Sequence, residues 1–171
     1  IPAYLYIDKM DLITDTFIQG SNQHDIKDAW VSVNDKFIGV YPLPALVPIL
    51  ETGEQEVRIF PGISVSGLSD FRITNPLYTV YENNIDLEGG VVDTIKPTIA
   101  YDDDAIFLFV EDFETSILIS EDIDENIETK VIEGTTDVFE GGKSGEIKLT
   151  SENGFIEVGS NLLYQIPDPE Y

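Results

Sequence analysis

The sequence contains no cysteine and only one histidine, one methionine and one tryptophan in 171 residues. The missing cysteine excludes disulfide bonds, thiolate catalysis and cysteine-ligated zinc. No apolar run approaches the roughly 18 residues of a membrane-spanning helix. Basic residues are also scarce, with 9 Lys and Arg against 33 Asp and Glu, a net charge of −24. Such a chain repels phosphate backbones and anionic lipids, so we expect neither nucleic acid nor a bare membrane surface as a partner.

The charge is unevenly distributed along the chain. Residues 1–101 hold 14 acidic and 6 basic residues, whereas residues 102–171 hold 19 acidic and 3 basic residues. This change in charge density coincides with a change in pattern, so we expect two domains, 1–101 and 102–171. The chain starts at Ile1-Pro2 without a recognisable signal peptide, which we interpret as a mature or trimmed start.

Short β-strand patterns dominate residues 1–101, and no segment keeps a helical apolar period over three turns. Residues 29–41 predict a β-hairpin with the turn Asn34-Asp35, and Pro42 is expected to end its second strand. Residues 54–60 predict a strand closed by Pro61-Gly62. Residues 78–87 and 91–101 predict a strand pair around the turn at 88–90. About seven short strands favour an antiparallel β-sandwich.

Residues 102–171 predict a second, partial β module. Residues 106–110 form a continuous apolar run that predicts a strand, and Asn153-Gly154 predicts a hairpin between 145–150 and 155–158. These three or four strands are about half of the eight that a jelly roll needs. We therefore expect the module to be the first half of a jelly roll and the chain to be a fragment of a longer protein.

Residues 27–63 resemble PEGA-like and carboxypeptidase-regulatory-like modules. The resemblance rests on Ala29 to Pro44, where a strand, a turn and a short strand lead to Gly39 and Pro42, and on a second, Gly-led strand from Gly53 to Gly62. Asn34-Asp35 replaces the usual Asp-Gly turn, and Ile63 replaces an aromatic residue. The resemblance implies an Ig-like sandwich for the first domain.

The whole chain also resembles a class of Bacteroidota surface lipoproteins, in which an Ig-like module precedes a jelly-roll, lectin-like module. The segments that carry this likeness are residues 1–8, 109–114 and 142–149. The resemblance implies an acylated cysteine upstream of Ile1, an outer-membrane location on the extracellular side, and a binding surface in place of catalysis.

Catalytic constellations are weak in this sequence. His24 lies in a polar loop beside Asp25, and no Gly-x-Ser-x-Gly nucleophile motif is present. The acidic runs at 111–114 and 122–127 do not match the alternating carboxylates of a jelly-roll glycosidase. We therefore expect no enzymatic activity.

Acidic loops offer hard oxygen ligands that suit calcium. The candidate ligands are Asp102, Asp103, Asp104, Glu121, Asp122 and Asp124. The alternative is that these are plain solvated acids, and no EF-hand loop is present. We expect no other cofactor.

Three further features are candidates for binding or modification. The aromatic residues that could stack on sugars are Trp30, Tyr41, Tyr78, Tyr81 and Phe113, although a core role is favoured for Trp30. Asp93-Thr94-Ile95 matches a short O-glycosylation motif of Bacteroidota surface proteins, which makes Thr94 the acceptor. The apolar segment 43–50 is expected to be a loop that either caps the core or exposes Leu43, Leu46, Val47 and Ile49 to a partner.

We therefore predict a non-catalytic accessory protein, for which the resemblance to the surface lipoproteins implies a lipid anchor and a place at the cell surface. Its expected partner is an outer-membrane complex containing a β-barrel. The alternative is a carbohydrate-binding module of a surface glycan-handling system.

Overall fold

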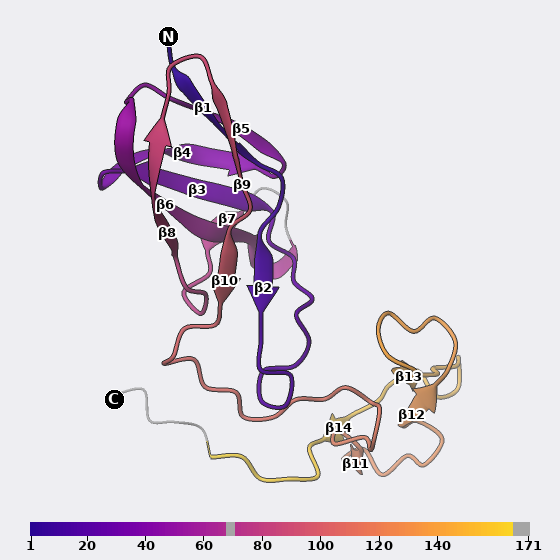
Figure 1. Ribbon diagram of the computed structural model, residues 1–171. Helices are drawn as coiled ribbons and strands as arrows, with labels where there is room; N and C mark the ends of the chain where they lie inside the picture. The colour runs from indigo at the N-terminus through magenta and orange to yellow at the C-terminus, as the bar shows by residue number, and fades with distance from the viewer. Residues whose placement is uncertain (68–70, 166–171) are drawn as a thin grey trace. The chain divides into compact units, whose positions relative to one another are not determined.

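The computed structural model describes residues 1–67 and 71–165 of the chain. The chain divides into two compact units, the first made of Ile1–Thr16 and Ser21–Ile106 and the second of Phe17–Gly20 and the residues from Phe107 onward. Strands form almost all of the regular structure, and the one helical element in the described ranges is the short 3-10 turn η1 (Val65–Gly67) (Figure 1). The prediction of an all-β, sandwich-like fold is confirmed.

The first unit contains two main sheets. One has the order β4 (Lys36–Pro42), β3 (Asp28–Val33), β6 (Gly53–Ser64), with β7 (Arg72–Thr74) and β8 (Tyr81–Leu87) both paired to the remaining side of β6. The other has the order β5 (Ala45–Ile49), β1 (Ala3–Ile7), β9 (Val92–Ile95), in which β1 is antiparallel to β5 and parallel to β9. A parallel pair, β2 (Asp11–Ile13) and β10 (Thr98–Ala100), follows β1 and β9 along the chain.

The core lies between these two sheets because successive strand residues face opposite sides. Every second residue of β1, β3 and β5 is buried, and β6 buries Val57 and Ile59. These residues belong to one apolar cluster to which both sheets contribute. The cluster comprises Ala3, Leu5, Ile7, Met10, Ala29, Val31, Val33, Ala45, Val47, Ile49, Val57, Ile59 and Leu87.

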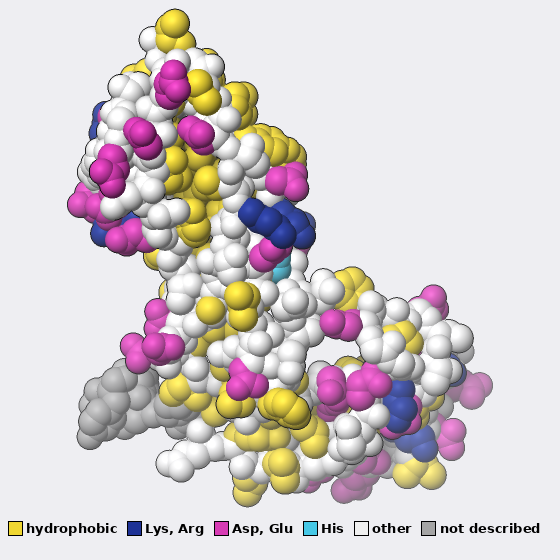
Figure 2. Space-filling view, in the orientation of Figure 1, with side chains coloured by type: hydrophobic (Ala, Val, Ile, Leu, Met, Phe, Trp, Pro, Cys, Tyr) yellow, Lys and Arg dark blue, Asp and Glu magenta, His cyan; other side chains and the backbone are white. Residues whose placement is uncertain are grey.

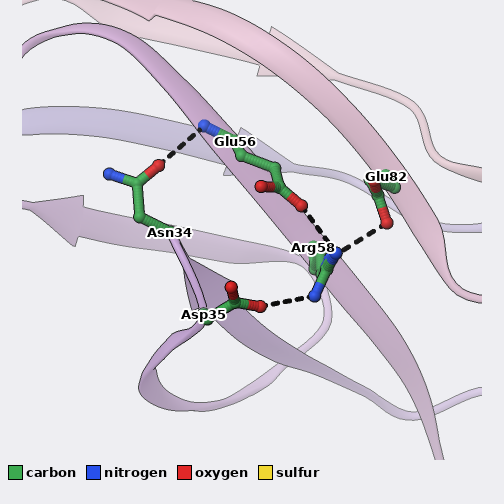
Figure 3. Close-up of polar contacts among 5 residues, drawn as sticks. All are labelled: Asn34, Asp35, Glu56, Arg58 and Glu82. Atoms are coloured by element: carbon green, nitrogen blue, oxygen red, sulfur yellow. Dashed lines mark hydrogen bonds and ion pairs between the residues drawn. The ribbon is translucent and has the colours of Figure 1, made fainter.

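The predicted hairpin at residues 29–41 is confirmed, with Asn34 and Asp35 as its two turn residues. Both have positive φ, 47° and 62°, as a two-residue turn that matches strand twist requires. The Asn34 side chain accepts a hydrogen bond from the Glu56 backbone N–H at 3.1 Å (Figure 3). This contact ties the turn to β6.

Arg58 organises the polar surface beside this turn. Its guanidinium pairs with Asp35 from the turn, Glu56 from its own strand at 2.8 Å, and Glu82 from β8 at 2.9 Å (Figure 3). The hydrogen bond to Glu82, followed by the charges of Glu56 and Glu82, raises the pKa of Arg58 despite partial burial. One cation thus holds three carboxylates that would otherwise repel one another.

Strand β6 does not end at Pro61-Gly62, contrary to the sequence-based expectation, but continues to Ser64. Pro61 lies between the end of the β8 pairing at Ile59 and the start of the β7 pairing at Gly62. Its carbonyl accepts a hydrogen bond from the Asn75 N–H at 3.1 Å. A proline is tolerated here because its missing N–H faces the gap between two partner strands.

Two further expectations for the first unit are wrong. The strands flanking the turn at 88–90 do not pair with each other, since β8 pairs with β6 and β9 pairs with β1. The apolar segment 43–50 is not a loop, because Ala45–Ile49 form β5 at one edge of its sheet. The strand end expected at Pro42 is confirmed.

Among its described residues, the second unit has two small antiparallel pairs, β11 (Glu121–Asp122) with β14 (Val158–Gly159) and β12 (Val131–Gly134) with β13 (Ser144–Ile147). The expected strand at 106–110 does not form, and 145–150 do not pair with 155–158 across Asn153-Gly154, so both predictions are wrong. Carboxylate side chains accept hydrogen bonds from many backbone N–H groups in the loops of this unit. Glu114 accepts hydrogen bonds from the N–H groups of Gly142 and Lys143 at 2.7 and 2.9 Å.

Within the part of the chain that the structure describes, no helix is suited in length and apolar character to cross a membrane.

Candidate functional site

The outer face of the three-stranded sheet carries six side chains without a charge. Cross-strand register places Pro48, Tyr4 and Val92 in one row and Leu46, Tyr6 and Thr94 in the next. We call these six residues the tyrosine face. Leu46 and Val92 are each 52% exposed, Pro48 and Thr94 are exposed, and the two tyrosines are half-buried. Hydrophobic side chains gather over the β1 and β5 region of the first unit in Figure 2.

The absence of charge on the tyrosine face is notable in a chain of net charge −24. The nearest acid along β1 is Asp8, whose carboxylate accepts a hydrogen bond from the Tyr6 hydroxyl at 3.3 Å. Burial, and then the Asp8 carboxylate, raise the pKa of Tyr6, so its hydroxyl stays protonated at neutral pH. The face therefore combines aliphatic contact area with tyrosines, which are residues enriched at protein interfaces.

The sequence-predicted partner residues fall on both sides of β5. Val47 and Ile49 are fully buried in the core and Leu43 packs against it, so these three do not form an exposed patch. Leu46 alone is exposed and belongs to the tyrosine face. Sequence reasoning missed Tyr4, Tyr6 and Val92 because both faces of β1 are apolar, so alternation gave no inward or outward assignment.

A second, partly exposed apolar cluster lies on the outer face of the other sheet. Trp30 is not in the core, contrary to the favoured expectation, because Ala29, Val31 and Val33 fill the inner face of β3. Trp30 lies opposite Phe60 and Val40, and its ring lies 6.1 Å from that of Phe37, centroid to centroid. We call Trp30, Phe37, Val40 and Phe60 the tryptophan face. Phe37 is 57% exposed.

Gly62 makes the position of Trp30 possible. A Cβ atom at Gly62 would lie 2.7 Å from Trp30 Nε1 and 3.0 Å from Asp28 Cβ. Gly62→Ala is therefore expected to displace the indole and to destabilise the first unit by about 1–3 kcal/mol, as overpacking does. Urea unfolding monitored by Trp30 emission measures this loss. Gly53→Ala is not a suitable control because φ is positive there, so Ser32→Ala, on the same face, serves as one. An unchanged midpoint and emission maximum for Gly62→Ala would contradict this packing.

The other predicted aromatic residues are at most partly accessible. Tyr41 and Tyr81 pack against the core of the first unit. Tyr78 packs on Tyr101, with 5.1 Å between ring centroids, and burial, then Tyr101, raise the pKa of Tyr78 to about 12. Phe113 lies over Gly145 in the second unit, where an added Cβ would meet its ring at 2.5 Å. None of these four offers an open stacking platform.

The predicted calcium ligands are divided between the two units. Asp102, Asp103 and Asp104 form a turn after β10, in which Asp102 accepts a hydrogen bond from the Asp104 N–H at 3.0 Å. Glu121 and Asp122 form the exposed strand β11. In the ranges 1–67 and 71–165, no group of three or more acidic or histidine side chains is placed to hold a metal ion.

Asp124, the remaining candidate, serves the backbone of the second unit. Burial acts to raise its pKa, but hydrogen bonds, first those from the N–H groups of Asn126 and Glu157 and then those of the Asp122 and Thr129 side chains, outweigh burial, and the pKa is lowered from 3.8. Because the folded-state pKa is depressed, the stabilisation is present above the unfolded pKa and is lost as pH falls through the folded value.

We accordingly expect acidification below pH 3.8 to loosen the loop around Asp124. The carboxyl carbon shift of Asp124 and the amide exchange of Asn126 and Glu157, followed by NMR, measure this change. Asp124→Asn removes the titrating group, so the pH dependence of these amides should disappear. A titration midpoint above that of a free aspartate would show that the hydrogen bonds do not control this carboxylate.

The remaining predicted residues lie at the surface. His24 is exposed, and its Nδ1 accepts a hydrogen bond from the Ile26 N–H at 3.3 Å, while Asp25 pairs with Lys27. Thr94 is exposed in the edge strand β9, within the tyrosine face. Comparison with known proteins gave no match: no protein-family model, curated protein or solved structure is significantly similar to the chain.

Proposed function

We propose that the protein is a non-catalytic accessory module that docks through the tyrosine face onto a protein of an outer-membrane complex at the cell surface. The observation that carries the proposal is an uncharged, partly aromatic sheet face on a chain of net charge −24. Exposed apolar patches of this kind mark interaction sites. The cellular location and a lipid anchor upstream of Ile1 belong to the proposal through the resemblance to Bacteroidota surface lipoproteins.

The form of the face favours a protein partner that covers the sheet. The two edge strands of this sheet, β5 and β9, differ in proline content. Strand β5 contains Pro48, which cannot donate a ladder hydrogen bond, whereas β9 contains no proline. A partner that packs on the face gains the apolar area of Leu46 and Val92, at about 25 cal/mol per Å². The tyrosines add contact area at low entropic cost because they are already half-buried.

Co-purification with detergent-solubilised outer membranes tests the proposal. The tagged protein should retain an integral outer-membrane protein, and retention should depend on the tyrosine face. Recovery of the wild-type protein as a free monomer from such membranes would count decisively against docking.

Carbohydrate binding is the second candidate function, and the position of Trp30 on an outer face favours it. Trp30 and the exposed Phe37 present two neighbouring rings, and aromatic rings are the side chains on which sugars stack. Affinity electrophoresis in soluble polysaccharides tests this function. Unretarded migration in every polysaccharide would remove it.

A further inference from the structure

The tryptophan face continues into an acidic surface on the same sheet. Cross-strand register places Arg58 opposite Ser32 and Glu82, Glu56 opposite Asn84, and Glu54 opposite Asp86, all on the outer side of β6. Six residue-to-residue steps along β6 lead from Glu54 to Phe60, roughly 20 Å at the rise of an extended strand. Figure 2 shows acidic side chains gathered over the β6 and β8 side of the first unit.

The acidic end of this surface lacks its own counter-charge. Arg58 is engaged by Asp35, Glu56 and Glu82. Glu54 and Asp86 face each other directly in the β6–β8 ladder, and neither has an ion pair within the described residues. Like charges that are directly opposite in a sheet destabilise it. A cation supplied from outside the unit would relieve this repulsion.

We propose that the surface from Trp30 to Glu54 binds an extended, arginine- or lysine-bearing segment of a partner protein. Charge complementarity selects the occupant: Asp35, Glu54, Glu56, Glu82 and Asp86 against Arg58 leave a net charge of −4 beside the aromatic cluster. Guanidinium and ammonium groups bind both to carboxylates and to the faces of Trp and Phe rings. The length of the surface matches about six residues of extended chain. This site lies on the sheet opposite the tyrosine face and does not depend on docking through that face.

Titration with a defined peptide tests the proposal in the full chain. The probe is an acetylated, amidated seven-residue peptide of alternating arginine and valine, and the readout is the emission of Trp30, the single tryptophan. We expect a saturable change in emission that weakens with added salt. Phe37→Ala should raise Kd about two- to fivefold through the lost cation–π contact. Glu54→Gln with Asp86→Asn should raise Kd about three- to tenfold.

Matched variants separate this site from general attraction to an acidic protein. Glu121→Gln with Asp122→Asn removes the same two charges from the second unit and should change Kd less than twofold. Glu54→Gln with Asp86→Asn should melt no lower than wild type, since it removes a repulsive pair. Two results with the peptide would overturn the proposal: an equal loss of affinity in the β11 control, or peptide binding that leaves Trp30 emission unchanged. A third result would also overturn it. In that case a soluble polysaccharide shifts Trp30 emission equally in wild type and in the Glu54/Asp86 variant, while the peptide does not shift it.

Discussion

Leu46→Glu is expected to weaken the proposed docking on the outer-membrane partner by more than about tenfold, since each 1.4 kcal/mol of binding free energy is tenfold in affinity. Leu46 lies beside Tyr6 on β5, at one edge of the tyrosine face, with 52% of its surface exposed. A glutamate there would be desolvated under a partner without a counter-ion, which costs several kcal/mol. The fraction of protein retained by solubilised outer membranes measures the loss.

Two other variants test whether the loss of docking is specific to the tyrosine face. Val92→Glu places the same charge at the opposite edge of the face and should weaken docking to a similar extent. Asn22→Glu adds one charge to an exposed loop of the first unit, outside both faces, and should change retention less than twofold. If all three variants bind as tightly as wild type, the tyrosine face is not the docking surface.

The hairpin at residues 29–41 was predictable because the residues that determine it are neighbours in the sequence. Asn34 and Asp35 tolerate positive φ, and the flanking strands alternate between buried and exposed positions. The position of Trp30 was not predictable from this pattern, because a tryptophan between two buried positions can lie on either face. Its outward position depends on Gly62, which is distant in sequence and leaves room for the indole.

Strand pairing was less predictable than strand position. The turn at 88–90 resembles a hairpin turn, yet it joins β8 and β9 in different sheets, where β8 pairs with β6 and β9 pairs with β1. The tyrosine face was also not predictable, because it depends on strand pairing. It forms because β1 pairs with β5 in antiparallel register and with β9 in parallel register. No local pattern encodes a parallel pairing between strands some 85 residues apart in the chain.

The apolar run at 106–110 shows that a sequence with high strand propensity does not form a strand when it has no partner strand. Apolar composition predicted a strand there, but up to residue 165 the second unit forms only short two-stranded pairs, and carboxylates such as Glu111 and Glu114 accept hydrogen bonds from its loop backbone. A strand forms only where a neighbour accepts its hydrogen bonds. Composition alone does not reveal whether that neighbour exists.

Leu5→Ala is expected to destabilise the first unit by about 2–5 kcal/mol, the range for truncating a fully buried leucine. Leu5 lies in β1, the central strand of its sheet, and is fully buried among core residues of both sheets. Domains of this size have a free energy of unfolding of about 5–15 kcal/mol, so the loss is a large part of the total. Urea unfolding followed by Trp30 emission measures it, because the single tryptophan lies in the first unit.

Val131→Ala is the matched core truncation for the second unit, where Val131 is one of the few buried side chains among the described residues. Trp30 emission should report the wild-type midpoint in this variant, because no core residue of the first unit has changed. The amide exchange of residues 131–134 and 144–147 should instead increase, since these form the β12–β13 pair. An equal shift of the Trp30 transition in both variants would mean that the two units unfold as one cooperative body.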